Sequence, residues 1–199
     1  MNTTDRIIKN NLRAWFKSAS KRQVLEGKQW YPKANLFANE LSEHSGFDSF
    51  KIAGVISSLS PNNRWERNLY DTKTVTWAST RKLKPSAVKV CTFNKNKQKA
   101  FDILDDSKTI EWKSRKTYSF GKNVGELDED YITIDRWHLR ACQSKPSRMV
   151  KAGEVKESVT PKQYDRIKDL TMEVAKEFNV KGYEFQAIVW VVIKEKTEA

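Results

Sequence analysis

The residues best suited to chemistry lie in the segment from Trp112 to Arg140. Lys116 follows two other cations closely, and Asp135 stands inside an otherwise apolar and aromatic stretch. An amine that is partly desolvated near other cations has a lowered pKa, so Lys116 could act as a nucleophile. A fixed carboxylate such as Asp135 could stabilise positive charge on a substrate or polarise a water molecule. This segment therefore predicts an acid or nucleophile site.

Both residues also have simpler explanations. Asp is a favoured N-cap, so Asp135 could only cap a helix that begins at Arg136. Most lysines are surface groups, so Lys116 could be a solvated contact to phosphate. The residues alone leave these alternatives open.

A second polar cluster follows an apolar stretch expected to be a buried helix at residues 50–59. It reads SPNNR at residues 60–64, and Trp65 begins the next helix. Asn amides can hydrogen-bond to base edges, Arg can pair with phosphate or guanine, and Trp can stack on a base. The alternative is an ordinary corner between two helices, with an Asn as the cap.

The composition favours a globular protein that binds a polyanion. The chain has 199 residues with seven Trp, nine Phe and six Tyr, enough for one core or for two small lobes. Its net charge is +12 and its isoelectric point is near 9.6, and nucleic acid is the usual partner of such a surface. A generic basic protein is the alternative.

Other classes of protein are disfavoured by the remaining residues. Cys91 and Cys142 lie far apart, which predicts neither a metal site nor a disulfide framework. The N-terminus has no apolar signal core, and the longest apolar run, residues 187–193, is too short to span a bilayer. We therefore expect a cytoplasmic, monomeric protein with no cofactor, no metal and no membrane association.

The elements that must position these residues are expected to be helices, because apolar residues recur at helical spacing almost throughout. Strand signals are weak and occur only at residues 131–134 and 189–193. The chain is thus predicted to be all-α, with about ten short helices. They are expected to begin after a Thr3 or Thr4 cap, near Asn35, after an Asp48 cap, at Trp65, at Pro85, at Lys95, near Lys116, at Asp135, at a Thr160-Pro161 cap and at Phe185.

Three motifs in order resemble a known family. Residues 59–66, LSPNNRWE, are similar to an L-S-x-Q-T-T-x-W-E corner, and residues 99–104, KAFDIL, to a K-A-x-x-I-L helix. RKT at 115–117 and TIDRWH at 133–138 are similar to an R-K-T-A … V-D-T-H pairing. Residues 50–142 therefore resemble the helix-hairpin-helix DNA base-excision glycosylases, the endonuclease III and 3-methyladenine glycosylase superfamily. The chain also resembles short phage-encoded proteins, which would make it a viral member acting in the host cytoplasm.

The resemblance implies specific roles. Asp135 would be the catalytic aspartate, and Lys116 the lysine that forms a Schiff base with the sugar in members with lyase activity. Ser60 and Asn62 would fill the gap left by a flipped base. Residues 112–114 would occupy the hairpin, where the family usually has glycines.

We therefore predict a two-lobed glycosylase-like enzyme that binds double-stranded DNA, flips a base and cleaves its N-glycosidic bond. One lobe would be a central helical bundle at residues 46–142, and the other would combine residues 1–45 and 143–199. A base-modifying phage enzyme on the same fold, a DNA-binding protein without chemistry and a protein inhibitor are alternatives. The expected DNA contacts are Ser60, Asn62, Asn63, Arg64, Lys99, Lys113, Ser114 and Arg115, and the expected base pocket is Trp65, Trp112, Trp137 and His138, with Glu66 as a supporting residue.

Overall fold

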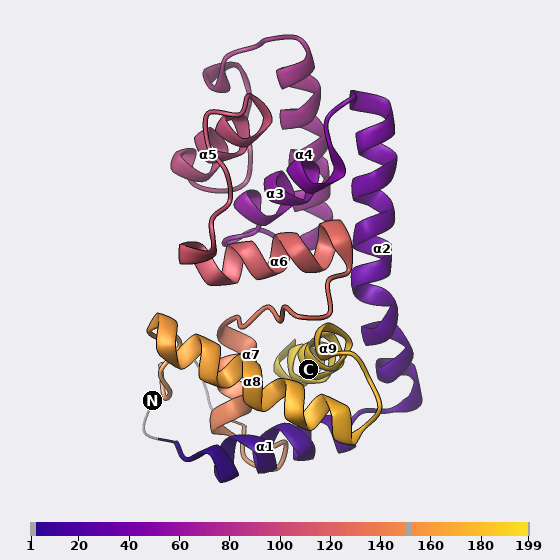
Figure 1. Cartoon of the computed structure of the whole chain (residues 1–199), viewed down its shortest axis with the longest axis vertical. Helices are drawn as coiled ribbons and strands as arrows, with labels where there is room; N and C mark the ends of the chain where they lie inside the picture. Colours follow the sequence, from indigo (N-terminus) through magenta and orange to yellow (C-terminus); the bar gives the residue numbers. More distant parts are fainter. Residues whose placement is uncertain (1–2, 150–152, 199) are drawn as a thin grey trace. The chain divides into compact units, whose positions relative to one another are not determined.

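A computed structural model describes residues 3–149 and 153–198, apart from the side chains of Trp112 and Glu198. Within these residues the regular secondary structure is helical, with nine α-helices, two short 3₁₀ helices and no strand (Figure 1). The prediction of an all-α fold is therefore confirmed.

The chain divides into two compact units. Unit 1 comprises Met1–Pro32 and Glu129–Ala199, and unit 2 comprises Lys33–Asp128. One boundary lies inside the long helix α2 (Lys21–Ser45), next to Pro32, which has no N–H to donate to the preceding turn. The boundaries predicted from the sequence lie after residues 45 and 142. With the observed boundaries, Asp135 belongs to unit 1 and Lys116 to unit 2.

Unit 1 is built around a buried C-terminal helix. Phe16 of α1 stacks on Phe178 and Phe185, with ring centroids 4.3 and 5.1 Å apart. The apolar run at residues 185–193 lies almost wholly inside this core. Besides the first part of α2, the unit contains α1 (Asp5–Lys17), α7 (Arg136–Gln143), α8 (Pro161–Glu177) and α9 (Gly182–Glu198).

Unit 2 is built around α3 (Ser49–Leu59), whose residues 52–59 are all buried. The helix packs against the three others that follow it in this unit (Figure 1). Asp48 caps its N-terminus by accepting hydrogen bonds from two backbone N–H groups, as predicted. The other elements of the unit are α4 (Trp65–Thr80), η1 (Pro85–Ala87), α5 (Asn94–Leu104), η2 (Trp112–Ser114) and α6 (Arg115–Glu126), together with the second part of α2.

Two weak strand signals correspond to no strand, and one predicted helix start is wrong. The possible strand at residues 189–193 lies inside α9, and residues 131–134 are extended but pair with no other strand. β-branched residues suit a buried helix as well as a strand when every side is covered, so their density does not decide between the two. The second helix begins at Lys21 and not near Asn35, because Pro32 is tolerated inside it.

Candidate functional site

Asp135 lies at the start of α7 and caps it. Its Oδ1 accepts a hydrogen bond of 2.8 Å from the backbone N–H of His138, and its backbone is extended. The residue is only partly buried. The capping prediction is therefore correct, and the helix terminus also stabilises the ionised carboxylate.

The extended segment that leads to Asp135 is held by one hydroxyl group. Tyr164 of α8 donates a hydrogen bond of 2.8 Å to the carbonyl of Ile132 and accepts one of 3.0 Å from the N–H of Ile134. All three residues are buried. The Tyr164 hydroxyl thus supplies the hydrogen-bond partners that a neighbouring strand would otherwise give to this buried backbone. It thereby fixes the segment that leads to Asp135.

A buried phenol lies near the carboxylate. Tyr31 of α2 donates a 2.8 Å hydrogen bond to Oε1 of Gln186 and also hydrogen-bonds to the Thr133 side chain. Burial raises the pKa of Tyr31 far above its usual value, and the negative charge of Asp135 acts in the same direction. The carboxylate therefore has a neutral, fixed polar neighbour. Tyr31, Tyr164 and Gln186 were not predicted from sequence, because nothing in their local patterns distinguishes them from other core residues.

His138 is a core residue of unit 1. Its Nε2 lies 2.9 Å from Oγ1 of Thr171, whose hydroxyl donates 2.8 Å to the carbonyl of Ile167. Because the Thr171 hydroxyl gives its proton to Ile167, it accepts from His138, and the imidazole proton is therefore assigned to Nε2. Burial lowers the pKa of His138 to about 4, so the imidazole is neutral at pH 7. Trp137, half-buried, lies against this core with the guanidinium of Arg140 4.6 Å from its ring centroid.

In unit 2, the predicted corner is organised by a fully buried carboxylate. Asp71 accepts hydrogen bonds from Nδ2 of Asn63 at 3.0 Å, Nε of Arg67 at 2.8 Å and the backbone N–H of Cys91 at 2.7 Å. The corner after α3 is thereby joined to α4 and to the loop before α5. Breaking such a buried, multiply bonded carboxylate is costly, so the corner is well fixed.

The tip of this corner faces solvent. Asn62 is exposed and has a left-handed backbone, with φ of 57°, and Arg64 is exposed as well. Thr92 donates a 2.9 Å hydrogen bond to the carbonyl of Pro61. Ser60 and Trp65 are partly buried on either side of the tip. Exposed amide and guanidinium groups on a fixed corner are suited to contacts with a nucleic acid.

The predicted hairpin is a single 3₁₀ turn, η2, that leads directly into α6. Ser114, the N-cap of α6, makes no side-chain capping hydrogen bond, and the first turn of the helix has no acidic residue. Instead it carries Arg115 and the exposed Lys116, after the exposed Lys113. Cations oppose the helix dipole at this end, so an anion bound there would be favoured. The predicted pocket wall at Trp112 lies outside the described side chains.

The lysine of unit 2 with a lowered pKa is Lys99. Partial burial lowers its pKa, and Lys108 acts in the same direction. Lys116, the predicted nucleophile, is exposed to solvent. Asp135, Trp137 and His138 thus come together in unit 1. The remaining predicted site residues belong to unit 2.

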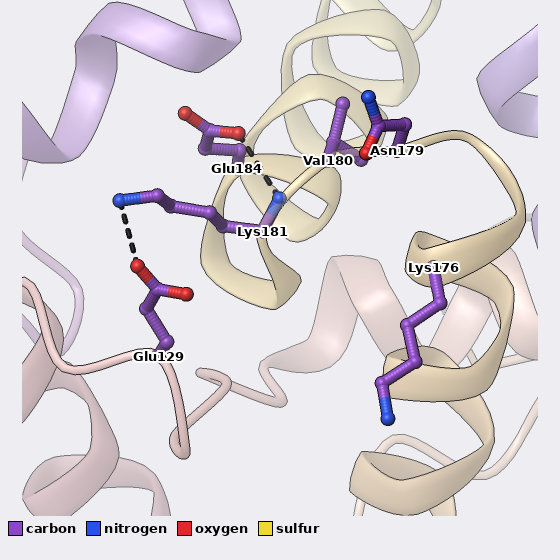
Figure 2. Close-up of a pocket in the computed structure, with 6 residues that line it drawn as sticks. All are labelled: Glu129, Lys176, Asn179, Val180, Lys181 and Glu184. Atoms are coloured by element: carbon purple, nitrogen blue, oxygen red, sulfur yellow. Dashed lines mark hydrogen bonds and ion pairs between the residues drawn. The ribbon is translucent and has the colours of Figure 1, made fainter.

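The surface depression in Figure 2 contains none of the predicted residues. It lies in unit 1, where Nζ of Lys181 pairs with Glu129 at 2.7 Å and its backbone N–H bonds to Glu184 at 3.1 Å. Lys181 and Glu129 form an ion pair, whereas the Glu184 carboxylate accepts from a neutral backbone N–H and keeps its charge. Nowhere among the described residues do three His, Cys, Asp or Glu side chains gather as a metal site.

A family model matches residues 1–197 of the chain. The chain belongs to DUF7178, a family of unknown function. No curated protein and no solved structure matches it. Membership of DUF7178 therefore covers nearly all of both units without assigning an activity to either. In the described part of this DUF7178 protein, no helix has the length and apolar character needed to cross a membrane.

Proposed function

We propose that this protein is a DNA-binding, glycosylase-like enzyme that uses Asp135 to stabilise positive charge on a deoxyribose while a flipped base departs. The observation that carries this proposal is the fixed, partly exposed carboxylate of Asp135 beside the neutral Tyr31. Cleavage of an N-glycosidic bond develops oxocarbenium character on the sugar, and an oriented carboxylate is the expected electrostatic partner.

DNA binding is supported by unit 2. Its corner at residues 60–64 exposes Asn62 and Arg64, and the first turn of α6 gathers cations with no acidic residue among them. Such groups recognise phosphates and base edges, and a net charge of +12 adds long-range attraction. The double-stranded substrate follows from the need to extrude a base from a stack.

The test is base release from duplex DNA that contains a panel of damaged or modified bases. Asp135→Asn is the central variant, because Asn also caps helices well and removes only the charge. We expect it to lower the rate of base release by at least about 100-fold, in the range of losses caused by removing one electrostatic group. Asp48→Asn is the matched control, since Asp48 caps α3 in the same way in unit 2. Full base release by the Asp135→Asn variant would refute the catalytic assignment.

Lys116 is tested separately, by borohydride trapping on DNA with an abasic site. Lyase chemistry through Lys116 predicts a covalent product that Lys116→Ala abolishes and Lys113→Ala retains. Because Lys116 is exposed, we propose base release without lyase activity as the main reaction. A trapped product that depends on Lys116 would overturn that preference.

DNA binding without chemistry is the second candidate, and the capping by Asp135 favours it. If Asp135 only begins α7, its charge-neutral variant should bind DNA normally and the native protein should release no base from any duplex in the panel. A base-modifying reaction on the same carboxylate would instead change the mass of the nucleoside without leaving an abasic site.

A further inference from the structure

Three aromatic side chains stand exposed on unit 2. Tyr70, Trp77 and Phe93 expose 60%, 53% and 56% of their surface. Single exposed apolar side chains are common on soluble proteins and do not by themselves indicate a binding site. All three share one further feature, and Trp77 and Phe93 have a second, that ordinary surface aromatics do not need to have.

Each ring has a cation beside it. The guanidinium of Arg67 lies 5.1 Å from the centroid of Tyr70, that of Arg81 lies 4.1 Å from Trp77, and the ammonium of Lys95 lies 5.8 Å from Phe93. A ring that carries a cation presents a stacking face and a charge that can bind phosphate at one place, although Arg67 beside Tyr70 is also paired with Asp71. This pairing is the local requirement for binding a nucleotide by its base and its phosphate together.

Trp77 and Phe93 also lie on a stretch without acidic residues, whereas Tyr70 directly precedes Asp71. Between Asp71 and Asp102 the sequence has eight Lys or Arg and no Asp or Glu. Six of these eight cations are exposed and the other two are partly buried. The surface therefore attracts a polyanion and has no carboxylate of its own in this stretch to repel one. The sequence pattern that could have identified it is this run free of acidic residues.

Two of the rings form a regular track along α4. Tyr70, Lys73, Trp77 and Arg81 follow one another at spacings of three or four residues, and all are exposed, so they share one helix face. Seven residues of helix place the two rings about 10 Å apart along its axis. That distance equals roughly three nucleotides at the 3.4 Å spacing of a stacked strand.

We infer that this α4 track, defined as Tyr70, Lys73, Trp77 and Arg81, binds single-stranded nucleic acid by stacking unpaired bases on its rings. Phe93, at the N-cap of α5, extends the aromatic surface toward the corner at residues 60–64, because the neighbouring Thr92 is hydrogen-bonded to Pro61. The site lies outside the chemistry proposed for Asp135 and does not require it. Its ligand is an unpaired strand, whereas the proposed enzyme acts on a base taken from a duplex.

Fluorescence anisotropy of labelled 20-nucleotide oligo(dT), oligo(rU) and a mixed-sequence duplex tests the proposal. Trp77→Ala is expected to weaken binding of the single strands by roughly 5- to 100-fold, the range for loss of one stacking partner. The duplex should lose less than about twofold, because paired bases do not expose their faces. Trp77→Phe should restore most of the single-strand affinity. Comparison of the affinities for oligo(dT) and oligo(rU) shows whether the sugar contributes to recognition.

Salt dependence separates stacking from simple charge attraction. Trp77→Ala should leave the slope of log affinity against log salt concentration unchanged, while Arg81→Gln should reduce it by about 0.7. Leu25→Ala is the matched control, since Leu25 is 57% exposed on unit 1 and has no place in the track. It should change neither affinity nor slope.

Several outcomes would overturn the inference. If Trp77→Ala weakened binding to single strands and to the duplex equally, Trp77 would be a general DNA contact. If joint replacement of Tyr70 and Trp77 by Ala left single-strand binding unchanged, the α4 track would not be the binding site. Preferential binding to anionic lipid vesicles or to polyglutamate would identify a different partner. The Asp135→Asn variant should bind oligo(dT) normally, so failure of the catalytic proposal and failure of this one are distinguishable.

Discussion

The two units use aromatic and polar residues in opposite ways. Unit 1 stacks Phe16, Phe178 and Phe185 inside its core and buries a hydrogen-bonded group of polar side chains near Asp135. Among the described side chains, the large aromatic residues with more than half of their surface exposed all belong to unit 2, and each has a cation beside it. Composition alone therefore says little about function. The same residue type stabilises the fold where it packs against other side chains, and remains available to a ligand where its surface is exposed.

The largest effect on stability is expected where α2 and α9 pack closely in unit 1. A Cβ added at Gly27 would lie 2.5 Å from the backbone Cα of Ile188, which cannot move aside alone. In unit 2 the tightest comparable contact, at Gly54, meets the terminal Cδ1 of Ile110 at 2.7 Å. We expect Gly27→Ala to lower the free energy of unfolding by about 3 kcal/mol or more, measured by urea denaturation.

Gly121→Ala is the control for this substitution. The nearest atom to its Cβ would be 3.7 Å away, so the better helix propensity of Ala should stabilise α6 by about 0.5–1 kcal/mol. If both variants lowered the free energy of unfolding by similar amounts, the close approach of α2 and α9 within unit 1 would not explain the effect of Gly27→Ala.

The next effect concerns the buried carboxylate of unit 2. Asp71→Ala leaves Asn63 and the backbone N–H of Cys91 without their acceptor, so we expect a loss of about 2–3 kcal/mol. Asp106→Asn, which keeps a residue type that tolerates the left-handed backbone of this position (φ 65°), breaks only an exposed ion pair with Lys51 and should cost less than about 1 kcal/mol. If the two variants are equally stable in urea, the corner is not organised by Asp71.

The third prediction uses the pH dependence of unit 1. In the unfolded chain His138 titrates near its ordinary pKa of 6.5, but in the folded protein burial lowers the pKa to about 4. The unfolded state therefore binds a proton first as the pH falls, and stability present above pH 6.5 is lost progressively toward pH 4. Between pH 7 and pH 5 the loss should be about 2 kcal/mol.

Urea denaturation of His138→Gln and His44→Gln over this pH range checks the assignment. The first substitution should remove the pH dependence between pH 7 and pH 5, because Gln does not titrate. The second changes an exposed histidine in unit 2 and should leave the dependence in place. A native protein equally stable at both pH values would contradict the buried, neutral state of His138.

The smallest effect is expected at the hydroxyl that holds the segment before Asp135. Tyr164→Phe leaves the buried N–H of Ile134 unpaired, so we expect a loss of about 1–2 kcal/mol and faster hydrogen exchange at Ile134. Tyr70→Phe changes an exposed hydroxyl and should stay within about 0.5 kcal/mol. Unaltered exchange at Ile134 would mean that Tyr164 does not fix the approach to the carboxylate.

Local signals predicted the helix starts well. Thr4, Asp48, Asp135 and Thr160 all cap helices where the sequence indicated, because capping depends on a few neighbouring residues. Helix continuation through Pro32 was missed, since tertiary packing can override a local breaker.

The candidate site was predictable only in part. Asp135 was identified because a carboxylate in an apolar segment is conspicuous in the sequence. Tyr31, on which its charge acts, and Gln186, the partner of Tyr31, come from distant parts of the chain, and no local pattern brings them together. The exposure of Tyr70 and Trp77 likewise depends on which face of α4 the core covers.

The division of the chain also has a consequence for synthesis on the ribosome. Unit 2 is one continuous segment and has its complete sequence once residue 128 has left the exit tunnel. Unit 1 lacks α7, α8 and α9 at that moment, so Leu12 and Trp15 of α1 have not yet met the helices that bury them. Co-translational folding should therefore begin with unit 2 and leave the apolar face of α1 exposed. A chaperone that binds apolar helices would be most useful in this period.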